Sequence, residues 1–325
     1  MFVDELTSFA QQAADQRIAD IAERLAAPVV VAVRGRPGVG CSTVGRALES
    51  AAADIRVKTG AGAADLDVHV FAEAVKPEDA GTLRPCLAVL NKADVLLAGG
   101  GTSDPWCARF AEILGVPVVA MSGLLAVAAL DDVDAQCWAD LQSLAADPGA
   151  LTGLDGSFDG FRTAPLVVPS SARDRLLQVL DLFGIALTVT ALRRDAAPAQ
   201  IRALWRRVSG IDAVLQQLLT AGAEVRYRRM LQAVGELEAL AVSDERVDAF
   251  LSRDDTVAAR MATALDFVDA CGLDAGPDEP LRRALHWRRR APLGELQRTC
   301  AADIVRGSLR LWAQTVATPM RAVSK

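Results

Sequence analysis

A short apolar segment leads directly into a glycine-rich turn, and this junction constrains the fold of the chain more than any other feature. The segment, residues 28–35, is rich in Val and is bounded by Pro28 and Gly35, which is typical of a buried strand. The turn consists of Gly35, Arg36, Pro37, Gly38, Val39, Gly40, Cys41, Ser42 and Thr43. A helix is predicted to follow over residues 42–53. This succession of strand, turn and helix predicts the start of an α/β sheet.

The turn matches most of the phosphate-binding pattern G-x-x-x-x-G-K-[ST]. Both glycines and the hydroxyl residue are present, but Cys41 occupies the lysine position. Glycines let successive backbone N–H groups point at phosphate oxygens, and the start of the next helix adds a partial positive charge. Ser42 would offer its hydroxyl to Mg²⁺. Cys41 cannot neutralise phosphate charge, so the alternative is a structural turn that binds no ligand.

Further strands alternate with helices along the first half of the chain. Apolar, β-branched runs predict strands within residues 54–60, 65–75, 85–94 and 116–122, and a helix is predicted over 106–115. We therefore expect a doubly wound, mostly parallel sheet. A later helix over residues 173–184 is expected to end at Gly184, and residues 186–192 could add one more strand.

The second half of the chain has the spacing of helices almost throughout. Helical stretches are predicted over 199–208, 211–242, 244–252, 254–272, 278–290 and 294–316. We expect three parts. Residues 1–27 form an N-terminal helix that could pack on the helical domain, residues 28–195 form the α/β domain, and residues 196–325 form an α-helical domain.

Two strand ends carry residues that suit a purine base. Residues 91–94 read Asn91-Lys92-Ala93-Asp94, the N-K-x-D pattern in which the Asp accepts from two guanine nitrogens, the Lys packs along the base and the Asn braces the phosphate loop. The next strand ends in Ser122, Gly123 and Leu124, which resembles the serine-alanine loop that completes the guanine pocket in GTPases. The alternative is that both are ordinary polar strand ends.

The order of these motifs resembles that of the translation-factor and dynamin-like GTPases. The sequence of residues 173–219, followed by long helices, is similar to actinobacterial dynamin-like GTPases, and the resemblance covers about residues 28–245. It implies a GTPase domain followed by a helical bundle that contacts membrane or partner chains. It also implies GTP or GDP with Mg²⁺ as ligands, and a heteromeric partner, such as a paralogous intact GTPase.

The chain departs from an active GTPase at several positions. Hydrolysis needs switch segments between the phosphate loop and N-K-x-D, including D-x-x-G, which does not occur there. The D-x-x-G strings at Asp181 and Asp269 lie after Asn91, and we interpret them as coincidental. Arg34, Arg36 or a residue of a partner could replace the missing lysine charge. We expect a degenerate GTPase that binds nucleotide with weak or no hydrolysis. Cys41, at a helix N-terminus, could alternatively be a reactive thiol of lowered pKa.

The amino-acid composition excludes some classes of ligand and partner. The chain has 35 Lys and Arg against 41 Asp and Glu, a net charge of −6, which argues against coating of nucleic acid. Its six Cys form no C-x-x-C pair and it has two His, so a zinc site is not expected.

We expect a cytoplasmic protein, peripheral to the inner membrane if an arginine cluster around Trp287 contacts anionic lipid. A regulator of an intact GTPase, a slow membrane-remodelling GTPase and a non-binding scaffold of an envelope or secretion complex remain open. Trp205 and Trp312 are predicted core residues.

Overall fold

The computed structural model describes residues 1–52, 55–60, 62–80, 85–94, 103–150, 154, 157–290 and 294–321. The chain divides into two compact units. Val29–Leu218 form the α/β unit, and Met1–Pro28 together with Leu219–Lys325 form the helical unit. The division falls at residue 218 rather than at the predicted residue 195, because the helices that follow the sheet pack with the sheet-containing unit.

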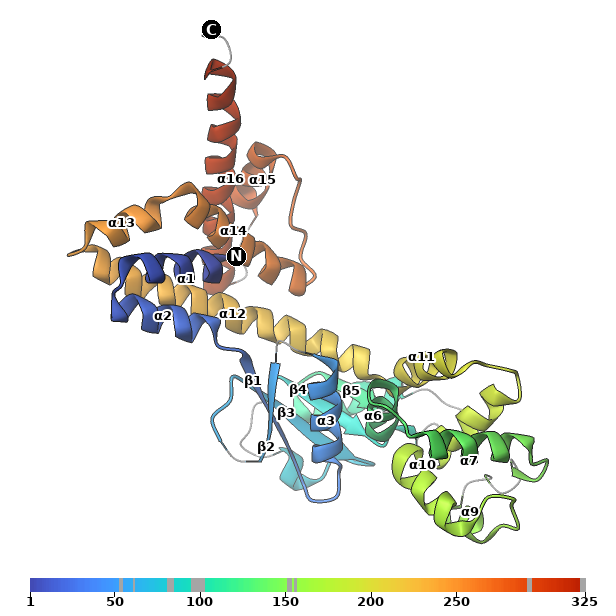
Figure 1. The fold of residues 1–325 in the computed structure, drawn as a ribbon. Coiled ribbons are helices and arrows are strands. Elements are labelled where there is room, and N and C mark those ends of the chain that lie inside the picture. The colour runs from blue at the N-terminus through green and yellow to red at the C-terminus, as the bar shows by residue number, and fades with distance from the viewer. Residues whose placement is uncertain are drawn as a thin grey trace. The chain divides into compact units, whose positions relative to one another are not determined.

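A five-stranded, all-parallel sheet forms the centre of the α/β unit, as the alternation of strands and helices predicted (Figure 1). Its strands, in spatial order, are β2 (Ile55–Thr59), β1 (Val29–Gly35), β3 (Leu66–Ala72), β4 (Leu87–Asn91) and β5 (Val118–Met121). Helices α3 (Cys41–Ala51), α5 (Asp104–Leu114) and α6 (Gly123–Leu130) and the short 3₁₀ helix η1 (Pro77–Ala80) connect and flank them. The chain leaves β1 for β2 on one side and returns to β3 on the other. Ligands of doubly wound sheets bind at the carboxyl ends of the strands where the order reverses in this way.

Four more helices of the α/β unit pack around Trp205. They are α7 (Ala135–Ala146), α9 (Phe158–Thr163), α10 (Ser170–Leu192) and α11 (Pro198–Ser209). The prediction of a strand over residues 186–192 was wrong, since α10 continues through Gly184 to Leu192. Ile185, Thr188 and Val189 are buried at helical spacing, and the Trp205 indole donates to the Thr188 hydroxyl at 2.9 Å. These contacts outweigh the β preference of branched residues.

Helix α10 has two further properties. By length and composition it is the one helix among the described residues that could cross a membrane, and a third of its most apolar stretch is buried in the protein. Its helical backbone is interrupted at Asp181, which has φ 61° and ψ 173°.

The helical unit combines both ends of the chain. It contains α1 (Phe2–Ala13), α2 (Gln16–Ala26), most of α12 (Ile211–Ala241), α13 (Glu245–Ser252), α14 (Asp254–Ala270), α15 (Pro280–Arg289) and α16 (Glu295–Arg321). The predicted single helix over residues 2–26 is two helices, because Ala14 adopts the left-handed conformation with φ 51°. Phe9 of α1 stacks on Phe250 at 4.3 Å, within one core shared by the N-terminal and C-terminal helices.

Candidate functional site

The glycine-rich turn runs from the end of β1 to the start of α3 and needs its glycines for two separate reasons. Gly38 and Gly40 have φ of 85° and 93°, values that residues other than glycine rarely adopt. A Cβ on Gly35 would lie 2.2 Å from the carbonyl oxygen of Val70 in β3. The turn therefore passes close to the neighbouring strand and then opens into the N-terminus of α3, whose first turn holds Ser42 and Thr43.

Asn91 joins the three segments that the sequence singled out. Its Nδ2 donates to the carbonyl oxygen of Val39 at 2.8 Å, and its Oδ1 accepts from the backbone N–H of Gly123 at 2.9 Å. The side chain is buried, at 3% exposure. One buried amide thus fixes the glycine-rich turn and the β5–α6 junction to the end of β4, and both of its hydrogen-bonding groups are used.

Asp94 is close to a helix that sequence reasoning did not connect with the site. It is 6% exposed. Burial, reinforced by the negative charge of Asp181 in α10, raises the pKa of the Asp94 carboxyl, and a hydrogen bond with Ser122 opposes the rise. Lys92 is exposed and has φ 58°. The interruption of the α10 helix at Asp181 sets this part of the helix apart, but no pattern in the sequence predicts such a kink.

Both arginines beside the turn are held by carboxylates. The Arg36 guanidinium donates to both oxygens of Asp79, through Nε at 3.0 Å and Nη2 at 3.2 Å, and the His69 ring nitrogen Nε2 lies 3.0 Å from the same carboxylate. Arg34 donates to Asp67 through Nε at 2.6 Å. His69 has a polar partner inside the fold, as expected of a core histidine. The arginine charges are therefore already compensated beside the turn.

The thiol of Cys41 lies next to the turn. It is half-buried, and a Cβ on Gly35 would lie 3.0 Å from its Sγ. Burial raises the pKa of the Cys41 thiol above its ordinary value. The hypothesis of a reactive thiolate with a lowered pKa was therefore wrong, because loss of water around the sulfur outweighs the backbone hydrogen bond that favours the thiolate.

A groove of about 420 Å³ opens beside the first turn of α3. Its size is within the range of small-molecule sites. Its wall includes three of the predicted site residues, Ser42, Thr43 and Leu124, together with Gln178 and Val179 from α10. Arg46 also lines it and donates to Asp131 at 2.8 Å. No pattern in the sequence indicated that α10 would line this groove.

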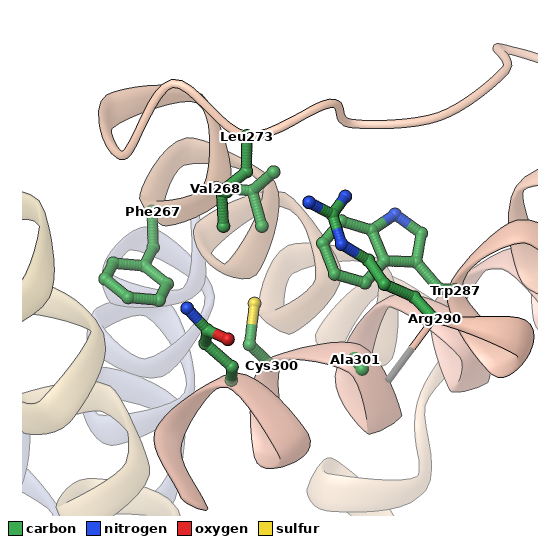
Figure 2. Close-up of a pocket in the computed structure, with 8 residues that line it drawn as sticks. Phe267, Val268, Leu273, Trp287, Arg290, Cys300 and Ala301 are labelled. Atoms are coloured by element: carbon green, nitrogen blue, oxygen red, sulfur yellow. The ribbon is translucent and has the colours of Figure 1, made fainter. Parts of the chain in front are cut away.

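The helical unit has hollows of its own, and the larger is a groove of about 760 Å³ whose lining includes Arg228 and Cys271. A small hollow of about 20 Å³ lies in the helical unit, between Phe267, Trp287 and Cys300 (Figure 2). That volume accommodates about one water molecule. Among the described residues, no group of three or more His, Cys, Asp or Glu side chains could hold a metal ion.

The fold and the site together define a doubly wound α/β protein with a glycine-rich turn at the carboxyl edge of its parallel sheet and an attached helical unit. No family model matches the chain. No curated protein and no solved structure matches it significantly.

Gly40→Ala is expected to destabilise the α/β unit by about 1–3 kcal/mol. The new Cβ would lie 2.4 Å from Asn91 Nδ2, so the bridge to Val39 would have to shift. Gly38→Ala is the matched control, because Gly38 also has positive φ but a Cβ there would meet no atom within 4 Å. Urea unfolding of both variants measures the difference, and equal losses would contradict a bridging role of Asn91.

Proposed function

We propose that this chain is a degenerate GTPase that binds guanine nucleotide, hydrolyses it weakly or not at all, and acts as partner or regulator of an intact GTPase. The observation that carries the proposal is the double hydrogen bond of Asn91, at 2.8 and 2.9 Å, to the glycine-rich turn and to the β5–α6 junction. A guanine-nucleotide site requires the same three segments to meet. The glycine-rich turn would bind the phosphates, and the end of β4 and the β5–α6 junction would bind the base.

In the proposed complex, the backbone N–H groups of residues 38–41 and the N-terminus of α3 bind the phosphates. Ser42 holds Mg²⁺ together with phosphate oxygens, the arrangement that Mg²⁺ commonly adopts on nucleotides. Asp94 accepts from guanine, the stem of Lys92 packs along the base, and Leu124 forms part of the rim.

Weak hydrolysis follows from the charges available. Cys41 supplies no cation, and Arg34 and Arg36 are engaged by Asp67 and Asp79. Loss of a single transition-state donor typically costs about 10²–10³ in rate. A chain that lacks the lysine and the D-x-x-G segment is therefore expected to bind nucleotide more effectively than it hydrolyses it, as a regulator would.

Restoring the lysine tests this division between binding and turnover. Cys41→Lys is expected to tighten GDP affinity by about tenfold, through charge-assisted hydrogen bonds to phosphate, while GTP hydrolysis stays slow. Cys271→Lys is the control, since Cys271 is exposed in the helical unit. Ordinary GTPase turnover by the unmodified, purified chain would defeat the proposal.

A second candidate is a scaffold that binds no nucleotide. The 6% exposure of Asp94 favours it, because a base cannot reach that carboxylate until the groups that cover it move. Nucleotide titration separates the two candidates.

Guanine affinity is expected to fall with decreasing pH sooner than for an ordinary aspartate. Burial raises the pKa of Asp94, so its carboxyl takes up a proton at a higher pH and then no longer accepts both guanine N–H groups. GDP titration across a pH series measures the effect, with inorganic pyrophosphate as the control ligand that lacks the base. Affinity that stays constant until the ordinary Asp range contradicts the assignment of Asp94 to the base.

A further inference from the structure

A buried carboxylate ties the glycine-rich turn to an exposed segment of the chain. Asp79 lies on η1, and its side chain is fully buried. It accepts two hydrogen bonds from the Arg36 guanidinium, at 3.0 and 3.2 Å, and a third from the backbone N–H of Lys76 at 2.8 Å. The His69 ring completes the group, with Nε2 at 3.0 Å. One carboxylate therefore joins the turn, strand β3 and η1.

This carboxylate stays charged inside the protein. Burial alone would raise its pKa, but the hydrogen bonds from Arg36, the Lys76 N–H and His69 outweigh burial and lower the pKa of Asp79 below its ordinary value. A buried charge that loses its partner costs more than an exposed one, because water does not replace the lost contact. Among the described residues, the Arg36 guanidinium donates to Asp79 alone. The pair is therefore held firmly as long as both charges remain.

The second arginine beside the turn is held differently. Arg34 donates to Asp67 at 2.6 Å and also to the carbonyl oxygens of Gly60 and Gly62, at 3.1 and 2.7 Å. The Asp67 side chain is 31% exposed, so water reaches it. Arg34 therefore keeps two backbone partners if the Asp67 charge is removed.

We propose that Asp79 withholds the Arg36 cation from phosphates bound at the glycine-rich turn, and that transfer of Arg36 to phosphate releases η1. Arg36 follows the first glycine of the turn, so it is the cation closest in sequence to the backbone N–H groups of residues 38–41. A diphosphate competes with the carboxylate for this guanidinium, since bidentate donation suits both anions. The inference rests on the proposed function, because it requires phosphate at the turn.

Release of η1 would alter an exposed part of the surface. Glu73, Lys76 and Glu78 are exposed, between β3 and the buried Asp79. Glu73 has φ 66°, within a tight turn closed by a backbone hydrogen bond of 2.8 Å. A residue other than glycine is strained at this φ and keeps it only when surrounding contacts hold it there. We therefore expect segment 73–78 to rearrange once Asp79 loses its partner, so that a bound nucleotide is detectable at the surface.

Pyrophosphate is the probe, because it tests the turn without the base. Asp79→Asn keeps the size of the side chain and an oxygen that accepts from the Lys76 N–H, but it removes the charge that holds Arg36. Calorimetry is expected to show pyrophosphate affinity about tenfold tighter than in the unmodified chain, the effect of a charge-assisted hydrogen bond to phosphate. Loss of a purely structural contact would weaken binding instead, so the sign of the change separates the two roles.

Two further variants show whether the gain comes from Arg36. Arg36→Gln combined with Asp79→Asn is expected to lose the whole gain. Asp67→Asn removes the same charge beside the turn, but Arg34 keeps its two carbonyl partners. Pyrophosphate affinity should therefore change by no more than about threefold in Asp67→Asn, within the effect of one partly exposed charge.

Hydrogen exchange of the unmodified chain reports the release of η1. Saturating pyrophosphate is expected to speed exchange of the Lys76 amide by about fivefold, the effect of one lost hydrogen bond, because this amide donates to the Asp79 carboxylate. The amides of β4 are the internal control and should keep their rates.

Three results overturn the proposal. These are pyrophosphate affinity in Asp79→Asn that is unchanged or weaker, a gain that survives Arg36→Gln, and exchange at Lys76 that saturating pyrophosphate leaves unchanged. Binding of GDP by the unmodified chain together with any of these results would keep the proposed function and remove only the role of Asp79. Absence of pyrophosphate and GDP binding in both the unmodified chain and Asp79→Asn would overturn the proposed function as well.

Discussion

Asp94→Asn is expected to reverse the base preference of the chain, lowering GDP affinity by about 10²–10⁴. A carboxylate accepts from the two adjacent N–H groups of guanine, and each charged hydrogen bond contributes about 1.5–3 kcal/mol. An amide presents one acceptor and one donor instead. That pattern matches xanthine, which carries an oxygen where guanine has its amino group, so xanthosine diphosphate should become the preferred ligand.

Competition titrations with GDP and xanthosine diphosphate measure the reversal. Asp131→Asn is the matched control, because Asp131 lines the groove and pairs with Arg46 but has no predicted contact with the base. GDP affinity that is unchanged in Asp94→Asn would remove Asp94 from the base site.

Trp205→Ala is expected to cost about 3–5 kcal/mol in the free energy of unfolding of the α/β unit. Trp205 is fully buried, stacks on Trp138 at 5.3 Å and donates to Thr188. The substitution would leave a large cavity at the centre of α6, α7, α10 and α11.

Hydrogen exchange locates this loss. Amide protection should fall across residues 123–209 and persist in residues 219–316, because the two compact units have separate cores. Trp106→Ala, at a 42% exposed site, should change stability by no more than about 0.5 kcal/mol. Equal loss of protection in both units would contradict the division of the chain at residue 218.

Local patterns were sufficient to predict the parallel sheet. Each strand is a compact apolar run bounded by Pro, Gly or polar residues, and strands buried on both faces need such runs wherever they lie in the chain. The long helices of the second half follow equally directly from apolar spacing. The break at Ala14 had a local signal that was missed, since the Asp15 side chain caps the next helix by accepting from the Arg17 N–H. The continuation of α10 through Gly184 could not be predicted, because it depends on contacts with distant residues, such as that of Trp205 with Thr188.

The candidate site likewise combines local motifs, which could be predicted, with contacts between distant residues, which could not. Residues 35–43 and Asn91 are local motifs, and the structure places Asn91 against Val39 as the motif implied. The pairing of Arg36 with Asp79, and the position of Asp181 near Asp94, join residues far apart in the sequence. A single sequence carries no signal for such pairs, although the first pair compensates the charge beside the turn and Asp181 adds to the effect of burial in raising the pKa of Asp94.

Calorimetric titration of the full chain with GDP, a non-hydrolysable GTP analogue and ADP, each with and without Mg²⁺, tests the central claim most directly. Micromolar binding of the guanine nucleotides and much weaker binding of ADP is the predicted result. Equal binding of ADP would contradict the base-reading role of residues 91–94. Binding of none of the three would contradict the proposed nucleotide site and favour the second candidate, a scaffold that binds no nucleotide.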